Sequence, residues 1–199
     1  MNIMLVGESG SGKDAISDIL GYRRIALGDP IRVIVNTLPS LNTAEKLVAS
    51  MVDTVPSDLK EVLRFYSQIP RTHKNRVQLQ GIGTYLRKHQ DDIWIKQAIA
   101  KVSGYNNVIT DCRRVNEFIA FKALGFKAVY VDAPESIRVA RLQQRDHEYS
   151  ASSANHECEG EIGGLRNLCD AVVVNDGTLE DLRVEVDLAL AWLNFTASN

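Results

Sequence analysis

The sequence contains few cysteines and no long hydrophobic run. Its 199 residues include three cysteines, Cys112, Cys158 and Cys169, and none of them forms a C-x-x-C pair. Because this number is odd, at least one thiol stays outside any intrachain disulfide, and the simplest expectation is a reduced, cytoplasmic chain. No apolar stretch is long enough to span a bilayer, and the first residues enter a predicted strand rather than a signal peptide. We therefore expect no membrane attachment.

The sequence also lacks an excess of positive charge. Lysine and arginine total 23 against 25 aspartates and glutamates, so the formal net charge is −2. This balance gives no reason to expect nucleic-acid binding. No repeat or low-complexity segment stands out. Apolar residues make up 45% of the chain, which is enough for one sizeable core with a small inserted subdomain.

One glycine-rich stretch is the strongest functional signal. It runs Gly7-Glu8-Ser9-Gly10-Ser11-Gly12-Lys13-Asp14 and fits G-x-x-x-x-G-K at its first seven positions. An apolar strand pattern precedes it and a helical pattern follows it, which is the context that this phosphate-binding motif needs. Glycines let backbone N–H groups turn inward, and those groups hold an anion together with the helix dipole. With Lys13 supplying a mobile charge, we predict a nucleoside triphosphate site; a glycine-rich turn that binds nothing would not need that lysine.

Asp14 departs from the usual motif, which has Ser or Thr after the lysine to help hold Mg²⁺. A carboxylate can also meet Mg²⁺, directly or through water. Alternatively, Asp14 only complements the positive end of the helix that follows. The sequence does not separate these two interpretations.

The remaining pattern predicts an α/β protein with a parallel sheet. Further strands are expected at residues 23–27, 107–111, 127–131 and 170–175, with helical segments between them. Such alternation is typical of right-handed crossovers in a parallel sheet with helices on both faces. We expect a single domain over residues 1–199, with a helical insertion at about 39–101 and a lid at about 138–164.

One of these helical segments is expected to have Pro30 in its first turn, residues 77–101 to form one long helix or two short ones, and another helix to run from Pro134 to about Asp146. Thr178 and Asp181 have the spacing of an N-cap at the start of the last helix.

Two groups of polar residues follow from this arrangement. Asp111 ends a predicted strand, where a Mg²⁺ ligand or general base belongs in an open α/β sheet, although a helix cap is the alternative. Arg113 would point into the same crevice. Gln80 and Arg87 are seven residues apart and share a helix face.

Three arginines, Arg138, Arg141 and Arg145, are spaced three and four apart on another predicted helix. Guanidinium groups gathered on one face repel each other unless an anion offsets them, and a transferring phosphoryl group is such an anion. The alternative is a solvated face whose arginines pair with Glu135, Asp146 or Glu148.

Taken together, these motifs resemble the nucleoside monophosphate kinase group of P-loop kinases, and more narrowly the phage-type deoxynucleoside monophosphate kinases. The similarity covers most of the chain and is weakest over residues 39–76. The matching segments are Ser11-Gly12-Lys13-Asp14, Ala26 to Arg32, Gln80 to Arg87 with Asp92-Ile93-Trp94, Asp111 to Glu117 as D-x-R-x-x-N-E, and Asn175 to Leu179. His156-Glu157-Cys158-Glu159 is similar to the family's H-P-S-E lid element but differs at its two middle positions.

The resemblance implies a three-layer P-loop kinase fold with a five-stranded parallel sheet, and phosphoryl transfer from ATP with Mg²⁺. It implies that residues Gly7 to Asp14 hold the ATP phosphates and that Asn175, Gly177 and Thr178 flank the adenine. Lys13, Asp111, Arg113, Arg138, Arg141 and Arg145 would be catalytic, with Asp14 and Asp111 at the metal. Arg32, Gln80, Arg87, Trp94 and Arg113 would bind the acceptor.

Other functions stay open at this point. Dephospho-coenzyme A kinase and phosphomevalonate kinase share parts of this layout, so the acceptor need not be a nucleotide. A non-catalytic ATP-binding module is a further alternative, although it has less need of three arginines on one helix. Expected partners are small-molecule nucleotides rather than nucleic acid or membrane. A homodimer is compatible with these expectations, although the sequence does not fix the oligomeric state, the base or the sugar.

Overall fold

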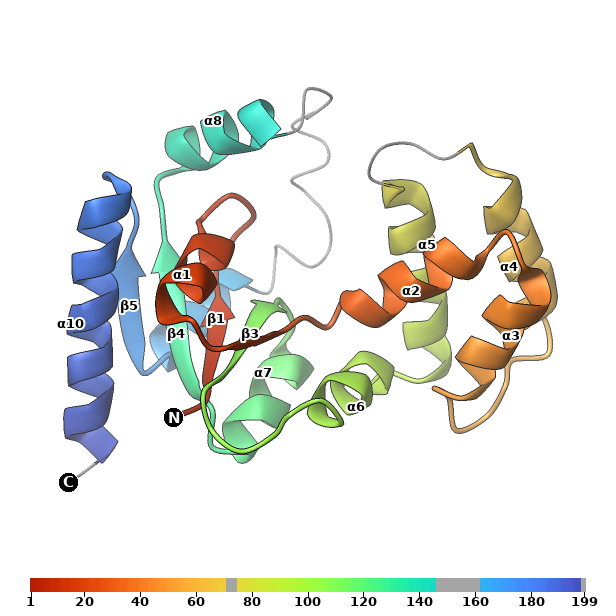
Figure 1. Cartoon of the computed structure of the whole chain (residues 1–199), viewed down its shortest axis with the longest axis horizontal. Coiled ribbons are helices and arrows are strands. Elements are labelled where there is room, and N and C mark those ends of the chain that lie inside the picture. Colours follow the sequence, from red (N-terminus) through yellow and green to blue (C-terminus); the bar gives the residue numbers. More distant parts are fainter. Residues whose placement is uncertain (71–74, 146–161, 198–199) are drawn as a thin grey trace. The chain divides into compact units, whose positions relative to one another are not determined.

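The computed structural model describes residues 1–70, 75–145 and 162–197 (Figure 1). The chain divides into two compact units. Unit 1 comprises Met1–Ile25 and Ser103–Asn199, and unit 2 comprises Ala26–Val102. Unit 1 contains the sheet, and unit 2 is helical in its described residues.

Unit 1 is built on a five-stranded parallel sheet in the order β2-β3-β1-β4-β5. The strands are β1 (Ile3–Val6), β2 (Arg23–Ile25), β3 (Asn107–Cys112), β4 (Lys127–Asp132) and β5 (Ala171–Val174). The predicted α/β class and the five parallel strands are thereby confirmed. The second strand is shorter than expected and ends at Ile25.

The central strand β1 is buried along its whole length because helices cover both faces of the sheet. It pairs with β3 on one side and with β4 on the other, and its last residue, Val6, lies opposite Cys112 and Tyr130. The register shifts between Met4 and Val6 where β1 meets β3. The carboxyl ends of the three inner strands therefore open at one edge of the sheet, where Gly7 begins.

Among the helices of unit 1 are α1 (Lys13–Leu20), α7 (Val115–Ala123), α8 (Glu135–Arg145) and α10 (Leu179–Ala197), with a short 3₁₀ turn, η2 (Arg166–Leu168). The helix expected from Pro134 to about Asp146 is thus confirmed over Glu135–Arg145, and Asp146 lies outside the described residues. None of the described helices combines the length and the apolarity needed to cross a lipid bilayer.

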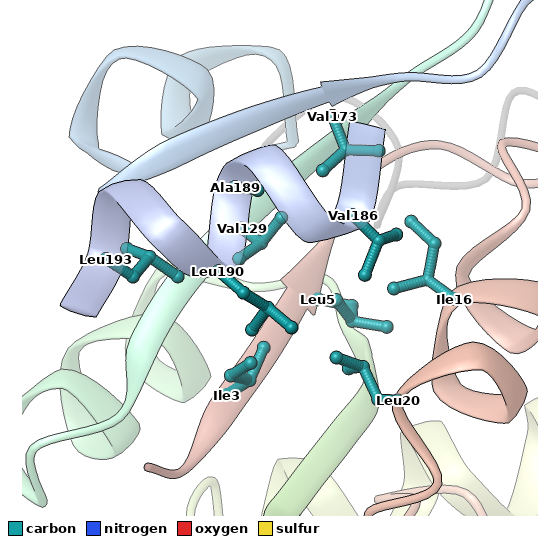
Figure 2. A pocket seen from close by; sticks show the side chains of 10 residues that line it. All are labelled: Ile3, Leu5, Ile16, Leu20, Val129, Val173, Val186, Ala189, Leu190 and Leu193. Atoms are coloured by element: carbon teal, nitrogen blue, oxygen red, sulfur yellow. The ribbon is translucent and has the colours of Figure 1, made fainter. Parts of the chain in front are cut away.

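One apolar core lies between the sheet and two helices, α1 and α10. Figure 2 shows it from close by: side chains from β1, β4, β5, α1 and α10 converge on a cavity of about 10 Å³. These side chains are Ile3, Leu5, Ile16, Leu20, Val129, Val173, Val186, Ala189, Leu190 and Leu193. A cavity of this size is at the lower limit for a single water molecule, and its lining is apolar, so the core is close-packed rather than a ligand site.

Unit 2 consists of five helices within its described residues: α2 (Asp29–Thr37), α3 (Leu41–Ala49), α4 (Leu59–Gln68), α5 (Arg76–His89) and α6 (Ile93–Ile99). Pro30 lies in the first turn of α2, as the sequence predicted. The region expected as one long helix or two short ones, residues 77–101, forms two. Its helices bury Leu63, Ile82 and Leu86 in a core of their own.

Replacing Leu193 with alanine should lower the free energy of unfolding by about 2 to 5 kcal/mol, because this side chain of α10 is fully buried against the sheet and its removal enlarges the cavity of Figure 2. Leu124→Ala is the matched control, since that leucine is 49% exposed; it should cost about 1 kcal/mol or less. Urea denaturation followed by circular dichroism measures both. Equal losses for the two variants would contradict this core assignment.

Candidate active site

The glycine-rich loop between β1 and α1 has the conformation that only glycine readily allows. Gly7, Gly10 and Gly12 have φ of 152°, 81° and 102°. A Cβ on Gly7 would lie 2.6 Å from the carbonyl oxygen of Val131, and one on Gly10 would lie 2.7 Å from that of Arg138. A Cβ on Gly12 would collide with the side-chain amide of Asn175. The loop is therefore packed tightly against β4, α8 and the residue that follows β5.

Lys13 begins helix α1, and its side chain folds back over the loop. Its Nζ donates to the carbonyl oxygens of Gly7 at 2.6 Å and Glu8 at 2.8 Å, and to Ser11 Oγ at 3.4 Å. The residue is only 8% exposed. Its ammonium group thus lies against the loop that the sequence predicts to hold phosphates.

The side chain of Asn175 holds the loop in place through hydrogen bonds. It is 4% exposed, and its Nδ2 donates to the carbonyl oxygen of Ser11 at 2.7 Å. Its Oδ1 accepts a hydrogen bond from Arg141 Nη2 at 3.0 Å. Its own backbone N–H donates to Asp132 at the end of β4. One side chain therefore connects the loop, helix α8 and the last strand.

Arg138 also connects α8 to the loop, through an ion pair with Glu8. Its Nε donates to the carbonyl oxygen of Ala133 at 3.2 Å, and its Nη1 to that of Ser9 at 3.4 Å. The Glu8 carboxylate offsets much of the charge on this guanidinium, which is only 15% exposed. Arg138 thus fixes the position of α8 against the loop.

Arg141 lies one turn further along α8 and is less fully satisfied. Its Nη2 bonds Asn175, but its buried Nη1 finds no hydrogen-bond partner in the described residues. This Nη1 lies 3.9 Å from where a Cβ of Gly12 would be. Arg145, the third predicted arginine, is exposed at the last residue of α8. An anion at the loop would satisfy the donor that Arg141 leaves unused.

Two carboxylates flank the loop. Asp111 is half-buried near the end of β3, and Asp14 is exposed in the first turn of α1. Among the described residues, no three His, Cys, Asp or Glu side chains gather as a metal site. Mg²⁺ does not require such a group, since it usually binds one or two carboxylates and completes its shell with water and phosphate. The residues present fit that cation, while Asp14 also complements the helix N-terminus.

The segment between β3 and α7 is held by hydrogen bonds from its backbone to the side chains of Asn116 and Glu117. Glu117 is 4% exposed, and its Oε2 accepts from the backbone N–H groups of Arg113 at 2.9 Å and Arg114 at 3.2 Å. Asn116 accepts from the N–H of Glu117 at 2.8 Å. These bonds fix the turn into α7 and hold the backbone of Arg113 beside Asp111. Glu117 has a structural role that the sequence motif alone did not reveal.

The turn after β5 is closed by a cap at the start of α10. The backbone N–H and Oγ1 of Thr178 donate to Asp181 Oδ2, and Asp181 N–H donates back to Thr178 Oγ1. Hydrogen bonds from Thr178 lower the pKa of the Asp181 carboxyl. A Cβ on Gly177 would lie 2.6 Å from Asp181 Oδ2. The predicted N-cap is confirmed; contact of this turn with adenine stays a prediction.

Unit 2 holds four residues predicted to bind the acceptor. Arg32 pairs with Asp29 on α2 at 2.9 Å, and Gln80 and Arg87 both lie on α5, as expected. Trp94 differs from the prediction: it is 1% exposed, and its indole N–H donates to the carbonyl oxygen of Gly83 at 3.3 Å. Its ring is part of the core of unit 2, so this side chain has no surface left to offer a ligand.

A pocket in unit 2 was not predicted from the sequence. It has a volume of about 330 Å³ and is lined by Asp58, Glu61, Val62, Phe65, Tyr66 and Tyr85. Tyr85 donates to Asp58 at 2.5 Å, and burial together with this bond raises the pKa of the phenol. A Cβ on Gly81 would overlap the Tyr66 ring, so that glycine lets α4 and α5 approach. The signal in the sequence was an aromatic pair at 65–66 and a glycine on the facing helix.

The cysteines do not offer a nucleophile in the described part of the chain. Burial raises the pKa of Cys112 well above its usual range and that of Cys169 to about 12, so both stay protonated at neutral pH. Cys158 and His156, with the rest of the predicted lid element, fall outside the described residues.

Asn175→Ala should weaken binding of ATP, the ligand expected from the sequence, by about tenfold, because the variant frees the Ser11 carbonyl and one Arg141 donor. Asn42→Ala, at an exposed position of α3, is the control and should bind like the original chain. Isothermal titration calorimetry measures both. Unchanged affinity in the Asn175 variant would show that this side chain does not organise the loop.

Comparisons with known proteins agree with the fold of the chain. A family model described as an AAA domain matches residues 3–160. The crystal structure of TT1252 from Thermus thermophilus is similar in fold, with 18% identity over 96% of both chains and a TM-score of 0.55. A gluconokinase from Sinorhizobium meliloti 1021 is 17% identical over 99% of this chain and 95% of that one, with a TM-score of 0.53. No curated protein matches. Since the family model covers most of the sequence, this chain belongs to the AAA domain family.

Proposed function

We propose that the protein is an ATP-dependent phosphotransferase that converts a (deoxy)nucleoside monophosphate into the diphosphate, releasing ADP. The observation that supports this most directly is the buried Nη1 of Arg141, which has no partner among the described residues and lies beside Gly12 of the phosphate loop. A transferring phosphoryl group is the anion that such a donor suits.

The residues of the loop would hold the donor. Gly7 to Asp14 would present inward-turned N–H groups to the β- and γ-phosphates of ATP at the N-terminus of α1. Lys13 Nζ is already held against the loop by the carbonyls of Gly7 and Glu8, so little rearrangement is needed for it to meet phosphate oxygens. Its bond to Ser11 Oγ, the longest of the three, is the easiest to exchange.

The arginines of α8 support a catalyst over a binding module. Arg138 is committed to Glu8 and to loop carbonyls, so it would orient α8 rather than follow charge in the reaction. Arg141 keeps one donor for the moving charge, and its other bond, to Asn175, holds the guanidinium in place. Preorganised donors of this kind stabilise a transition state without reorganisation at the moment of reaction. A role for Arg145 stays part of the proposal.

Asp111, with Asp14, would hold Mg²⁺ next to the phosphates. When bound, the ion neutralises phosphate charge and aligns the oxygens for in-line transfer. Asp111 comes from the buried strand β3, whose pairing with β1 fixes it beside the start of the loop. Arg113, held by the Glu117 bond to its backbone, would bind the acceptor phosphate from the same strand end.

Unit 2 would bind the acceptor, through Arg32, Gln80 and Arg87. The lining of the pocket between α4 and α5 supports the proposal that the acceptor is a nucleotide rather than a sugar acid. Its aromatic residues, Phe65, Tyr66 and Tyr85, offer faces on which a base can stack. Its two carboxylates, Asp58 and Glu61, favour the uncharged base of a nucleotide, with its amino groups, and repel the carboxylate of a sugar acid.

The second candidate is a kinase whose acceptor is not a nucleotide. The fold similarity to a gluconokinase is the observation in its favour, although at 17% identity that similarity shows the fold alone. A non-catalytic ATP-binding module would explain the loop, Lys13 and the structural contacts of Arg138, but it has less need of the Nη1 donor of Arg141.

The test of the proposal is ADP release from MgATP with each common ribo- and deoxyribonucleoside monophosphate, and with gluconate and dephospho-coenzyme A. We expect turnover with one or more nucleotides and none with the other two acceptors. Lys13→Ala, prepared in the same way, should lose the activity and thereby excludes a contaminating kinase. ATP binding without transfer to any nucleotide would contradict the proposed acceptor class.

Arg141→Ala should lower kcat by roughly 10³, by analogy with arginines that act on transition-state charge, while the KM for ATP rises by no more than about tenfold. Arg183→Ala, at a 52% exposed arginine of α10, is the control and should keep normal kinetics. Steady-state kinetics with the best acceptor give both constants. A variant that loses ATP affinity but retains kcat would show that Arg141 only supports the loop.

A further inference from the structure

Helix α10 is apolar on two opposite faces. One face, formed by Leu182, Val186, Ala189 and Leu193, is buried in the core beside the sheet, and Figure 2 shows the last three of these residues. On the other face Val184, Leu188, Trp192 and Phe195 are 54%, 60%, 55% and 64% exposed. We define the outer stripe as these four residues together with Ala191, which is also exposed. Packing against the sheet uses only the first face of the helix. The apolar character of the second face therefore needs another explanation.

The outer stripe has the spacing of a helix that packs on another helix. Val184, Leu188, Ala191 and Phe195 follow one another at intervals of four, three and four residues, which is the heptad pattern of paired helices. Trp192 flanks this line, and its ring lies 6.4 Å from that of Phe195. Its indole N–H donates to the carbonyl oxygen of Asp170, which fixes the ring at the edge of the stripe. The apolar residues thus form one ordered surface rather than scattered exposed side chains.

We propose that the outer stripe is the interface with a second copy of this chain, paired antiparallel through α10. Antiparallel pairing places large residues against small ones: Phe195 of one copy faces Val184 of the other, and Leu188 faces Ala191. The stripe is therefore complementary to itself under a two-fold axis, as a symmetric dimer requires.

The charges on α10 select the same orientation. Its first half carries Glu180, Asp181, Glu185 and Asp187 against one arginine, Arg183, whereas residues 188–197 carry no charged side chain. Antiparallel pairing sets each acidic half against an uncharged half. Parallel pairing would bring the two acidic halves together and would also align the two helix dipoles unfavourably.

The size of the outer stripe indicates how tight this dimer is. With each of the four large side chains leaving on the order of 100 Å² open, the stripe offers roughly 400 Å² per copy. Two copies, with the helix surface beside the stripe, reach the low end of specific interfaces, so we expect a dissociation constant on the order of 10 μM. This inference does not rest on the proposed function, because no residue of the outer stripe belongs to the phosphate loop.

Sedimentation velocity between about 1 and 200 μM, a range that brackets the expected constant, tests the proposal. The original chain should shift from one copy to two as the concentration rises. Leu188→Glu should stay a single chain throughout, because it buries a carboxylate in the interface. Ile119→Glu on α7 is the matched control, since Ile119 is also 60% exposed, and it should dimerise normally. Circular dichroism checks that each variant is folded, and Phe195→Ser replaces Leu188→Glu if that variant unfolds.

Cross-linking tests the orientation. In an antiparallel pair, a chain with Val184→Cys should form a disulfide with a chain bearing Phe195→Cys. Val184→Cys alone should not link to itself, because its two copies would lie about 16 Å apart along the helix axis. A chain that remains monomeric at the highest concentration, a dimer that survives Leu188→Glu, or efficient self-linking of Val184→Cys would each overturn the proposal.

Discussion

The hydrogen bond from Asn175 to the Ser11 carbonyl is the contact on which the candidate site depends. It joins residues that are 164 positions apart in the sequence and holds the segment after β5 against the glycine-rich loop. The Oδ1 atom of the same side chain accepts a hydrogen bond from Arg141. One buried side chain therefore also positions α8 against the loop. The conformation of Gly12 is part of this arrangement, since any side chain there would displace Asn175. The glycine-rich loop, α8 and the segment after β5 therefore hold one another in place without a ligand.

The charges around the loop divide into two kinds. Glu8 neutralises Arg138, and loop carbonyls hold Lys13, so these groups keep the unliganded loop stable despite its crowded positive charge. The Nη1 donor of Arg141 has no hydrogen-bond partner among the described residues, and Asp111 is held at the strand end beside the loop. This donor is therefore available to an additional anion bound at the loop.

The sequence was sufficient where signals were local. The glycine-rich loop between a strand and a helix, the five strands, Pro30 in the first turn of α2 and the Thr178–Asp181 cap all depend on spacings of a few residues, and the structure has each of them. It was insufficient where a role depends on distant packing. The sequence around Asn175 does not indicate that its side-chain amide bonds to the Ser11 carbonyl, and the sequence around Trp94 does not indicate that its ring is buried. The pairing of Glu8 with Arg138 and the pocket between α4 and α5 likewise require the tertiary fold.

The central claim is that the loop, Arg141 and Asn175 together form a preorganised phosphate site. Its most direct test is the ¹H–¹⁵N NMR spectrum of the chain during titration with a non-hydrolysable MgATP analogue. The account predicts large shifts for the backbone amides of Gly10 to Lys13 and for the Arg141 guanidinium, with the Asn175 side-chain amide remaining protected from solvent exchange throughout. Shifts confined to other parts of unit 1, or loss of that protection on binding, would contradict it.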